Sequence, residues 1–241
     1  MRDKEGRLLL DNCSKINDYI SGRKKKTWLI MNGKKFLFKS GGSNYEVYAE
    51  LISCELAKQC GFSTAFYDIA IMNGETGVLT PSFLNRGDII ISGDQYLNNA
   101  RSVAFQNNFN MDFRKNSIDN VLSAVSILES GYDDIAEVIL FRLLQLWCFD
   151  LAIMESDRNN TNWSLIKNIN GYVTLAPIYD CSTMCMLNND ISSFKSCLRN
   201  ESQIFSIINS IQYSLKLRTE SLDNLFYDFE FLCVSFPDEM A

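Results

Sequence analysis

The chain has 241 residues, of which 46% are apolar, and it carries 23 Lys and Arg against 29 Asp and Glu, a formal charge of −6. This length is enough for one packed domain or two small lobes. The absence of histidine excludes imidazole bases, Ser-His-Asp and Cys-His nucleophilic sites, and metal sites that need an imidazole ligand. Any chemistry must therefore come from carboxylate, lysine, hydroxyl or thiol groups.

The cysteines and the most apolar stretch indicate the cellular compartment. The eight cysteines contain no Cys-x-x-Cys pair, and the charged opening Met1-Arg2-Asp3-Lys4-Glu5 is unlike a signal peptide. Polar residues interrupt the apolar stretch 135–154 at regular intervals, which favours a buried helix over a membrane span. We expect a cytoplasmic protein with reduced thiols and no membrane contact.

The net negative charge argues against direct binding of nucleic acid. The basic run Arg23-Lys24-Lys25-Lys26 is a local exception. Its simplest interpretation is a solvated loop.

The first eighty residues predict a small sheet that carries one helix. Asn32-Gly33 and Asn73-Gly74 each separate two strand-like runs, and both residues of an Asn-Gly turn tolerate positive φ. Between these hairpins, apolar residues recur at helical spacing over 47–57, and Gly61 offers a C-terminal cap.

The remainder of the chain is predicted to be mainly helical. Helical periodicity covers 118–129, 133–154, 202–217 and 220–234, and two short apolar runs at 163–166 and 172–175 suit strands. We predict an N-lobe over residues 1–80 and a C-lobe over 81–241, joined by a hinge at about 78–83.

Five polar positions lie where this architecture would bring them together. Lys39 ends the second strand of the first hairpin, and Glu50 lies on the following helix, where its carboxylate could pair with that lysine. Asp157 and Asn162 lie in the loop after the long apolar helix, and Asp180 follows the next apolar run.

Phosphoryl transfer from ATP needs such a set, because its catalysis is mainly positioning and neutralisation of phosphate charge. A lysine held by a glutamate binds phosphates, and an aspartate takes the proton of the acceptor hydroxyl. An asparagine and a second aspartate hold Mg²⁺, which prefers oxygen ligands. The spacing Asp157-x4-Asn162 is that of the protein-kinase catalytic loop, and Asp180 would correspond to the aspartate of the Asp-Phe-Gly motif.

Each of these residues also has a simpler interpretation by itself. Asp157 and Asn162 suit a surface turn, Lys39 an exposed strand end, Glu50 a solvated helix face, and Asp180 a helix N-cap. Their order along the chain favours the kinase interpretation. We therefore predict an α+β, bilobal, protein-kinase-like fold, with a small β-rich N-lobe carrying one helix and a mainly α-helical C-lobe.

At these residues the sequence resembles the HipA-like kinase family, including its shorter CtkA type. The resemblance spans most of the chain and rests on six segments: 21–27; Phe38-Lys39; Glu50 with Leu56-Ala57 and Gly61-Phe62; 78–83; Asp157-Arg158-x-x-x-Asn162-Trp163; and Ala176-Pro177-Ile178-Tyr179-Asp180.

The resemblance implies a Ser/Thr protein kinase that uses ATP and Mg²⁺. It makes Asp157 the base, Lys39 the phosphate ligand that pairs with Glu50, and Asn162 and Asp180 the magnesium ligands. It implies further nucleotide contacts at Ser21, Gly22 and Lys26 near the phosphate loop and at Leu79, Thr80 and Ser82 in the hinge.

The resemblance also concerns regulation and partners. In the family a phosphate-loop serine is autophosphorylated, which switches the enzyme off; Ser21 stands at such a position, and an unmodified loop serine is the alternative. The resemblance implies a protein substrate with a Ser or Thr acceptor. It implies an antitoxin as partner if the chain is the toxin of a toxin–antitoxin operon. It also implies a small partner protein in place of the family's extra amino-terminal subdomain, which we expect this chain to lack.

The sequence departs from the family motif at one position of the expected catalytic loop. The family's Asp-Arg-His is Asp157-Arg158-Asn159 here, which we interpret as altered tuning of the site. The alternatives are a lipid or small-molecule kinase, because the ATP machinery does not specify the acceptor, and a pseudokinase that binds a partner or nucleotide without turnover.

Overall fold

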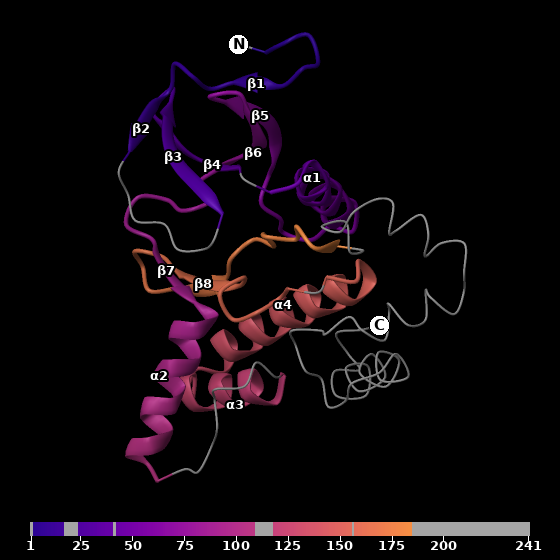
Figure 1. The fold of residues 1–241 in the computed structure, drawn as a ribbon. Helices are drawn as coiled ribbons and strands as arrows, with labels where there is room; N and C mark the ends of the chain where they lie inside the picture. Colours follow the sequence, from indigo (N-terminus) through magenta and orange to yellow (C-terminus); the bar gives the residue numbers. More distant parts are fainter. Residues whose placement is uncertain (1, 17–23, 41, 109–117, 156, 185–241) are drawn as a thin grey trace, which may run out of the picture. The chain divides into compact units, whose positions relative to one another are not determined.

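The computed structural model describes residues 2–16, 24–40, 42–108, 118–155 and 157–184. These residues form two compact units (Figure 1). The first contains residues up to 85 together with 177–184, and the second contains 86–176. The predicted division at residue 80 assigned 177–184 to the C-lobe; the contacts of this segment group it with the N-terminal sheet.

A six-stranded sheet forms the centre of the first unit. Its strands, in the order β1-β5-β6-β4-β3-β2, are β1 (Leu8–Leu9), β5 (Asp68–Met72), β6 (Glu75–Pro81), β4 (Lys34–Ser40), β3 (Lys25–Met31) and β2 (Ser14–Ile16). Both predicted hairpins are confirmed. Their turns place Asn32 and Gly33 at φ 51° and 74°, and Asn73 and Gly74 at φ 51° and 77°, the backbone that a type I′ turn requires.

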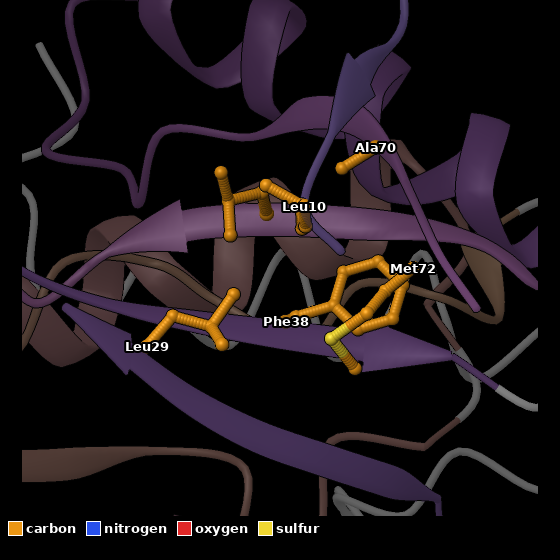
Figure 2. Close-up of a cluster of buried hydrophobic side chains, with 6 residues drawn as sticks. Leu10, Leu29, Phe38, Ala70 and Met72 are labelled. Atoms are coloured by element: carbon orange, nitrogen blue, oxygen red, sulfur yellow. The ribbon is translucent and has the colours of Figure 1, made fainter. Parts of the chain in front are cut away.

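The two faces of this sheet have different surroundings because successive side chains of a strand alternate between faces. Leu29, Phe38 and Leu79 lie on one face, in a buried cluster with Leu10, Ala70 and Met72 (Figure 2). The opposite face carries Lys39 and Val78, which are cross-strand partners. Val78 packs there against Val47 and Cys54 of the helix α1 (Asn44–Gln59).

The helix α1 has both of its ends defined by local sequence. The Ser43 hydroxyl accepts a hydrogen bond from the Glu46 N–H at the start. At the end, the N–H of Phe62 donates to Ala57 O and the N–H of Gly61 to Lys58 O, with Gly61 at φ 76°. This is the Schellman arrangement, so the predicted glycine cap is confirmed.

The second unit contains three helices and a three-stranded antiparallel sheet among its described residues. The helices are α2 (Gly93–Gln106), α3 (Ile118–Leu128) and α4 (Asp133–Ala152), and the strands, in the order β7-β8-β9, are β7 (Ile89–Ser92), β8 (Ser164–Lys167) and β9 (Val173–Leu175). The predictions for α3, α4, β8 and β9 are confirmed within two residues at each end. The helices predicted at 202–217 and 220–234 lie outside the described residues.

The strand β7 and the helix α2 were not predicted. Their sequence signal is a capping box, in which the side chains of Ser92 and Gln95 each bond the other's backbone N–H. Gly93 begins the helix directly against Trp163, since a Cβ at this position would lie 2.2 Å from the indole ring. Close packing by a distant tryptophan therefore fixes where this helix starts.

Two findings concern the helices and the cysteines of the described residues. None of the helices in the described ranges is both long enough and apolar enough to cross a membrane. The five cysteines within those ranges are free thiols.

The two faces of β3 give a stability prediction. Leu29 is 0% exposed, whereas its neighbour Ile30 is 37% exposed. We expect Leu29→Ala to lower the free energy of unfolding by about 2–5 kcal/mol, because it opens a cavity in the buried cluster. The matched variant Ile30→Ala should lower it by less than about 1 kcal/mol. Urea denaturation followed by circular dichroism measures both, and equal losses would contradict the assignment of the two faces.

Candidate active site

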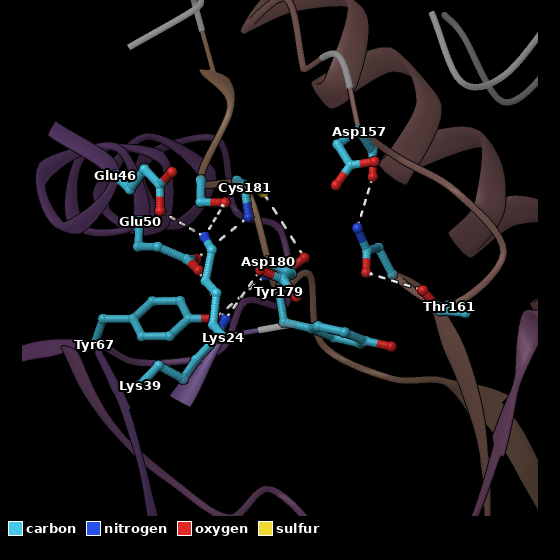
Figure 3. Close-up of polar contacts among 12 residues, drawn as sticks. Lys24, Lys39, Glu46, Glu50, Tyr67, Asp157, Thr161, Tyr179, Asp180 and Cys181 are labelled. Carbon is cyan, nitrogen blue, oxygen red and sulfur yellow. Dashed lines mark hydrogen bonds and ion pairs between the residues drawn. The ribbon is translucent and has the colours of Figure 1, made fainter. Parts of the chain in front are cut away.

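The first unit brings together three of the predicted residues in a buried ion-pair network. The Lys39 ammonium Nζ lies 2.8 Å from Glu50 Oε1 and 3.0 Å from Asp180 Oδ1. Lys39 comes from β4, Glu50 from the buried face of α1, and Asp180 from the segment after β9 (Figure 3). The predicted pairing of Lys39 with Glu50 is thus present, and Asp180 completes it.

Burial and ion pairing shift the pKa values of the charged groups in this network in opposite directions. Lys39 is 7% exposed and Glu50 3%. Burial disfavours the Lys39 ammonium, but the charges of Glu50 and Asp180 outweigh it and raise the pKa of Lys39 well above its usual value. Burial likewise opposes ionisation of Asp180, yet Lys39, with Lys26 and Lys24, holds the pKa of that carboxyl below its usual value. Both groups are therefore charged at neutral pH.

Two further contacts hold the carboxylates in place. The backbone N–H of Cys181 donates to Glu50 Oε2 at 3.2 Å, and the N–H of Asp180 donates to the Tyr67 hydroxyl oxygen at 3.3 Å. Burial, and then the charge of Glu50, raises the pKa of Tyr67 well above its usual value, so its hydroxyl stays protonated. These contacts hold Asp180 at φ 58°, a left-handed conformation that is uncommon for residues other than glycine.

Tyr67 was not predicted as a site residue, and its ring centroid lies 5.7 Å from Lys39 Nζ. No sequence motif marks it. Its position follows from the sheet, because it precedes β5 and packs with Val47 and Val78 on the face that carries Lys39.

Further lysines surround the network. Lys26 is the direct cross-strand partner of Lys39, so both side chains leave the same face of the sheet; burial lowers the pKa of Lys26. Lys24 Nζ lies 2.8 Å from Glu46 Oε2 and 2.9 Å from Ser182 Oγ. Lysine side chains can bind phosphate groups. The predicted phosphate-loop residues Ser21 and Gly22 lie outside the described residues.

The three predicted hinge residues occupy different surroundings. Thr80 is buried and pairs with Leu37, which puts it on the face of Lys39. Leu79 points to the other face, into the apolar cluster, so that only its backbone could contact a nucleotide bound beside Lys39. Ser82 follows the strand; its N–H donates to Lys35 O at 2.8 Å, and its hydroxyl accepts from the Leu84 N–H at 3.3 Å.

In the second unit, Asp157 and Asn162 belong to one tight loop between α4 and β8. The side-chain amide of Asn162 donates to Asp157 O at 2.6 Å, and the N–H of Asp157 donates to Glu155 Oε1 at 2.8 Å. The Asp157 side chain is exposed. The Asp-x4-Asn spacing thus lets the asparagine fold back onto the backbone of the aspartate and leaves the carboxylate facing solvent.

A buried ion pair anchors this loop to α4. Arg158 makes two hydrogen bonds to the Asp150 carboxylate, Nε to Oδ2 at 2.8 Å and Nη2 to Oδ1 at 3.0 Å. Its Nη1 donates to Asn162 O. The arginine is 1% exposed and the aspartate 4%. Asp150 was not predicted as part of the site; its sequence signal is a carboxylate in the apolar last turns of α4, which needs a cationic partner when buried.

Asp180 in the first unit and Asn162 in the second each carry a side-chain oxygen of the kind that Mg²⁺ prefers as a ligand. No group of three or more Cys, Asp and Glu side chains that could hold a metal ion occurs in the ranges that the structure describes. Mg²⁺ shared with nucleotide phosphates needs only one or two protein oxygen ligands and keeps waters. Asp180 Oδ2 accepts no hydrogen bond from a described residue, and the Asn162 side chain offers an amide oxygen.

Comparison with known proteins gives a likeness of fold. No protein-family model and no curated protein sequence matches the chain. Among solved structures, the chain is similar to the Helicobacter pylori proinflammatory kinase CtkA, with a TM-score of 0.71 and 16% sequence identity over 89% of this chain and 73% of that one. This likeness shows a kinase-like fold. The predicted fold class is confirmed, and the predicted resemblance to HipA-like kinases is confirmed at the level of the fold.

A second match is to HipA of the Shewanella oneidensis MR-1 toxin–antitoxin system, solved with HipB and operator DNA. The identity is 17% over 90% of this chain and 63% of that one, with a TM-score of 0.49.

The ion pair beneath the loop of Asp157 and Asn162 gives a second stability prediction. We expect Asp150→Ala to lower the free energy of unfolding by about 3–5 kcal/mol, because it leaves the Arg158 guanidinium buried without its carboxylate. The double variant Asp150→Leu with Arg158→Met should recover most of the loss. Chemical denaturation measures each change.

The control is the ion pair of Arg2 with Asp68, whose side chains are 51% and 24% exposed. Asp68→Ala should lower the free energy of unfolding by less than about 1 kcal/mol. Equal losses in Asp150→Ala and Asp68→Ala would show that burial of the Arg158 pair is unimportant.

Proposed function

We propose that the protein is an ATP-dependent Ser/Thr protein kinase of HipA-like type. The buried network of Lys39, Glu50 and Asp180 in a chain with a CtkA-like fold is the observation that carries this proposal. A lysine ion-paired to a helix glutamate is the arrangement that holds ATP phosphates in protein kinases.

Each residue has a defined role in the proposed reaction. Lys39, held by Glu50, would bind phosphate oxygens, and Asn162 and Asp180 would hold the magnesium. Magnesium-bound ATP supplies the phosphoryl group and neutralises part of its charge. Asp157 orients the acceptor hydroxyl and takes its proton while the oxygen bonds to the γ-phosphorus and the bond to the leaving ADP oxygen breaks.

The exposed carboxylate of Asp157 supports its role as the base. One of its oxygens, Oδ2, accepts no hydrogen bond from a described residue, so it is available to a hydroxyl group. The backbone around it is fixed by Asn162, Glu155 and Arg158, which limits the reorganisation that catalysis requires.

The choice of a protein hydroxyl as acceptor comes from the sequence resemblance. So do two finer parts of the proposal, a toxin role with an antitoxin or small-subdomain partner, and inhibitory autophosphorylation of Ser21. A phosphate on Ser21 would add nearly two negative charges beside the site of the ATP phosphates. Mass spectrometry after incubation with ATP and Mg²⁺ tests it; an unmodified Ser21 in an active enzyme would rule out this switch.

The central test is transfer of radiolabel from [γ-³²P]ATP to protein, followed by phosphoamino-acid analysis. We expect label on Ser or Thr in the wild type. Asp157→Ala should lower kcat by about 100-fold or more, with the KM for ATP little changed, because a general base acts in the transition state. Label transfer that persists in Asp157→Ala would refute the assigned base.

Two other outcomes of this test favour the alternatives. Label that appears only on an added lipid or small-molecule alcohol supports a kinase of that class. Nucleotide binding without any transfer by the wild type supports a pseudokinase.

The lysine network predicts a separate effect on nucleotide binding. Lys39→Met should weaken binding of Mg²⁺-ADP by at least about tenfold, because it removes the cation that faces the phosphates and leaves two buried carboxylates unpaired. Removal of magnesium with EDTA should abolish transfer in the wild type. Isothermal titration calorimetry measures the binding.

The matched control is Lys25→Met, one residue before the cross-strand partner of Lys39. The Lys25 side chain is 71% exposed and pairs with Glu75, and it leaves the opposite face of the sheet. Binding of Mg²⁺-ADP should be unchanged in this variant. Equal weakening by Lys25→Met and Lys39→Met would contradict the nucleotide site assigned to the face of Lys39.

A further inference from the structure

The side chain of Asn159 connects Asp157 to Thr161 within one loop. Its amide Nδ2 donates to Asp157 Oδ1 at 2.9 Å. Its Oδ1 accepts two hydrogen bonds from Thr161, one from the backbone N–H at 2.9 Å and one from the hydroxyl. Asn159 thus contacts the proposed base directly, three residues before Asn162.

The orientation of this amide follows from its partners. A backbone N–H can only donate, so the atom of Asn159 that faces the Thr161 N–H must be the oxygen. The nitrogen then necessarily faces the Asp157 carboxylate, which when ionised can only accept. The loop therefore holds a donor against one oxygen of the base and leaves the other oxygen without a partner among the described residues.

We infer that Asn159 is a positioning residue for Asp157, an inference that rests on the proposed kinase function. Its hydrogen bond to Oδ1 fixes the rotation of the exposed carboxylate and presents Oδ2 to the acceptor hydroxyl. An exposed aspartate would otherwise sample several rotamers. Only the orientation in which Oδ2 meets the substrate proton is productive, and misplacement of a reacting group by about 1 Å can cost a factor of about 100 in rate.

The contacts also define which residues can replace Asn159. The position requires one donor toward Asp157 and one acceptor toward Thr161. A neutral histidine, which the family motif has at this position, offers one of each. An aspartate keeps the acceptor toward Thr161 but has no donor, and it adds a second negative charge beside Asp157. Asn159→Asp therefore preserves the loop contact while it removes the positioning contact.

The test compares Asn159→Asp and Asn159→His with the wild type. We expect Asn159→Asp to lower kcat by about tenfold to 100-fold. The KM for ATP, the affinity for Mg²⁺-ADP measured by calorimetry, and the thermal unfolding midpoint should stay at wild-type values. Asn159→His should retain kcat within about threefold above pH 7.5, where a histidine of ordinary pKa is neutral.

Asn168→Asp provides a matched control in the same unit. Asn168 Oδ1 accepts hydrogen bonds from the N–H groups of Asn170 and Tyr172, at 2.9 and 3.0 Å, in the turn between β8 and β9. The substitution is thus chemically the same, in a loop held by the same kind of acceptor, but with no contact to Asp157. Its kcat should equal that of the wild type.

Two outcomes would overturn the inference. Wild-type kcat in Asn159→Asp would show that the donor is unimportant. If Asn159→His lowers kcat as much as Asn159→Asp does, the role of Asn159 does not depend on its offering one hydrogen-bond donor and one acceptor. If Asn159→Asp does not fold, a loss of kcat by about tenfold or more in Asn159→His still overturns the inference. Absence of label transfer by the wild type, or persistence of transfer in Asp157→Ala, would refute the proposed function itself and is distinguishable from these results.

Discussion

The pairing of Lys39 with Glu50 and Asp180 is the interaction on which the first unit depends. Lys39 and Glu50 are buried there and Asp180 is partly buried, which is unfavourable for charged groups unless they are paired and hydrogen-bonded. The backbone N–H of Cys181 donates to the Glu50 carboxylate, and the Tyr67 hydroxyl accepts from the backbone N–H of Asp180. Because Asp180 lies 141 residues after Lys39 in the chain, this requirement also fixes where the segment 177–184 joins the unit.

The alternation of side chains along β4 explains how one strand serves both stability and the candidate site. Phe38 lies in the apolar cluster, and Lys39, its neighbour, lies on the other face beside Tyr67 and α1. A shift of one residue in the pairing of β4 with β6 would exchange these surroundings. The two Asn-Gly turns and the buried cluster that set this register therefore also determine the position of the lysine.

The loop of Asp157 follows a different principle, because its conformation is determined by polar contacts. Arg158 is buried against Asp150 and holds the loop from within, whereas the adjacent carboxylate of Asp157 faces solvent. Asn159 and Asn162 both bond Asp157, one at its carboxylate and one at its backbone carbonyl. A fixed backbone beneath an exposed carboxylate suits the catalytic role proposed for Asp157, and the buried ion pair of Arg158 with Asp150 helps to fix it.

The sequence by itself determined the elements whose signals are local. The hairpins at Asn32-Gly33 and Asn73-Gly74, the glycine cap of α1, and the loop from Asp157 to Asn162 all depend on residues close together in the chain. The tertiary structure alone decided the parallel pairing of β1 with β5, the placement of α2 against Trp163, the partner of Arg158, and the position of Tyr67 beside Lys39. Backbone turns and caps are stabilised within a few residues, whereas the partner of a buried charge or ring depends on which distant segments the packed chain brings into contact.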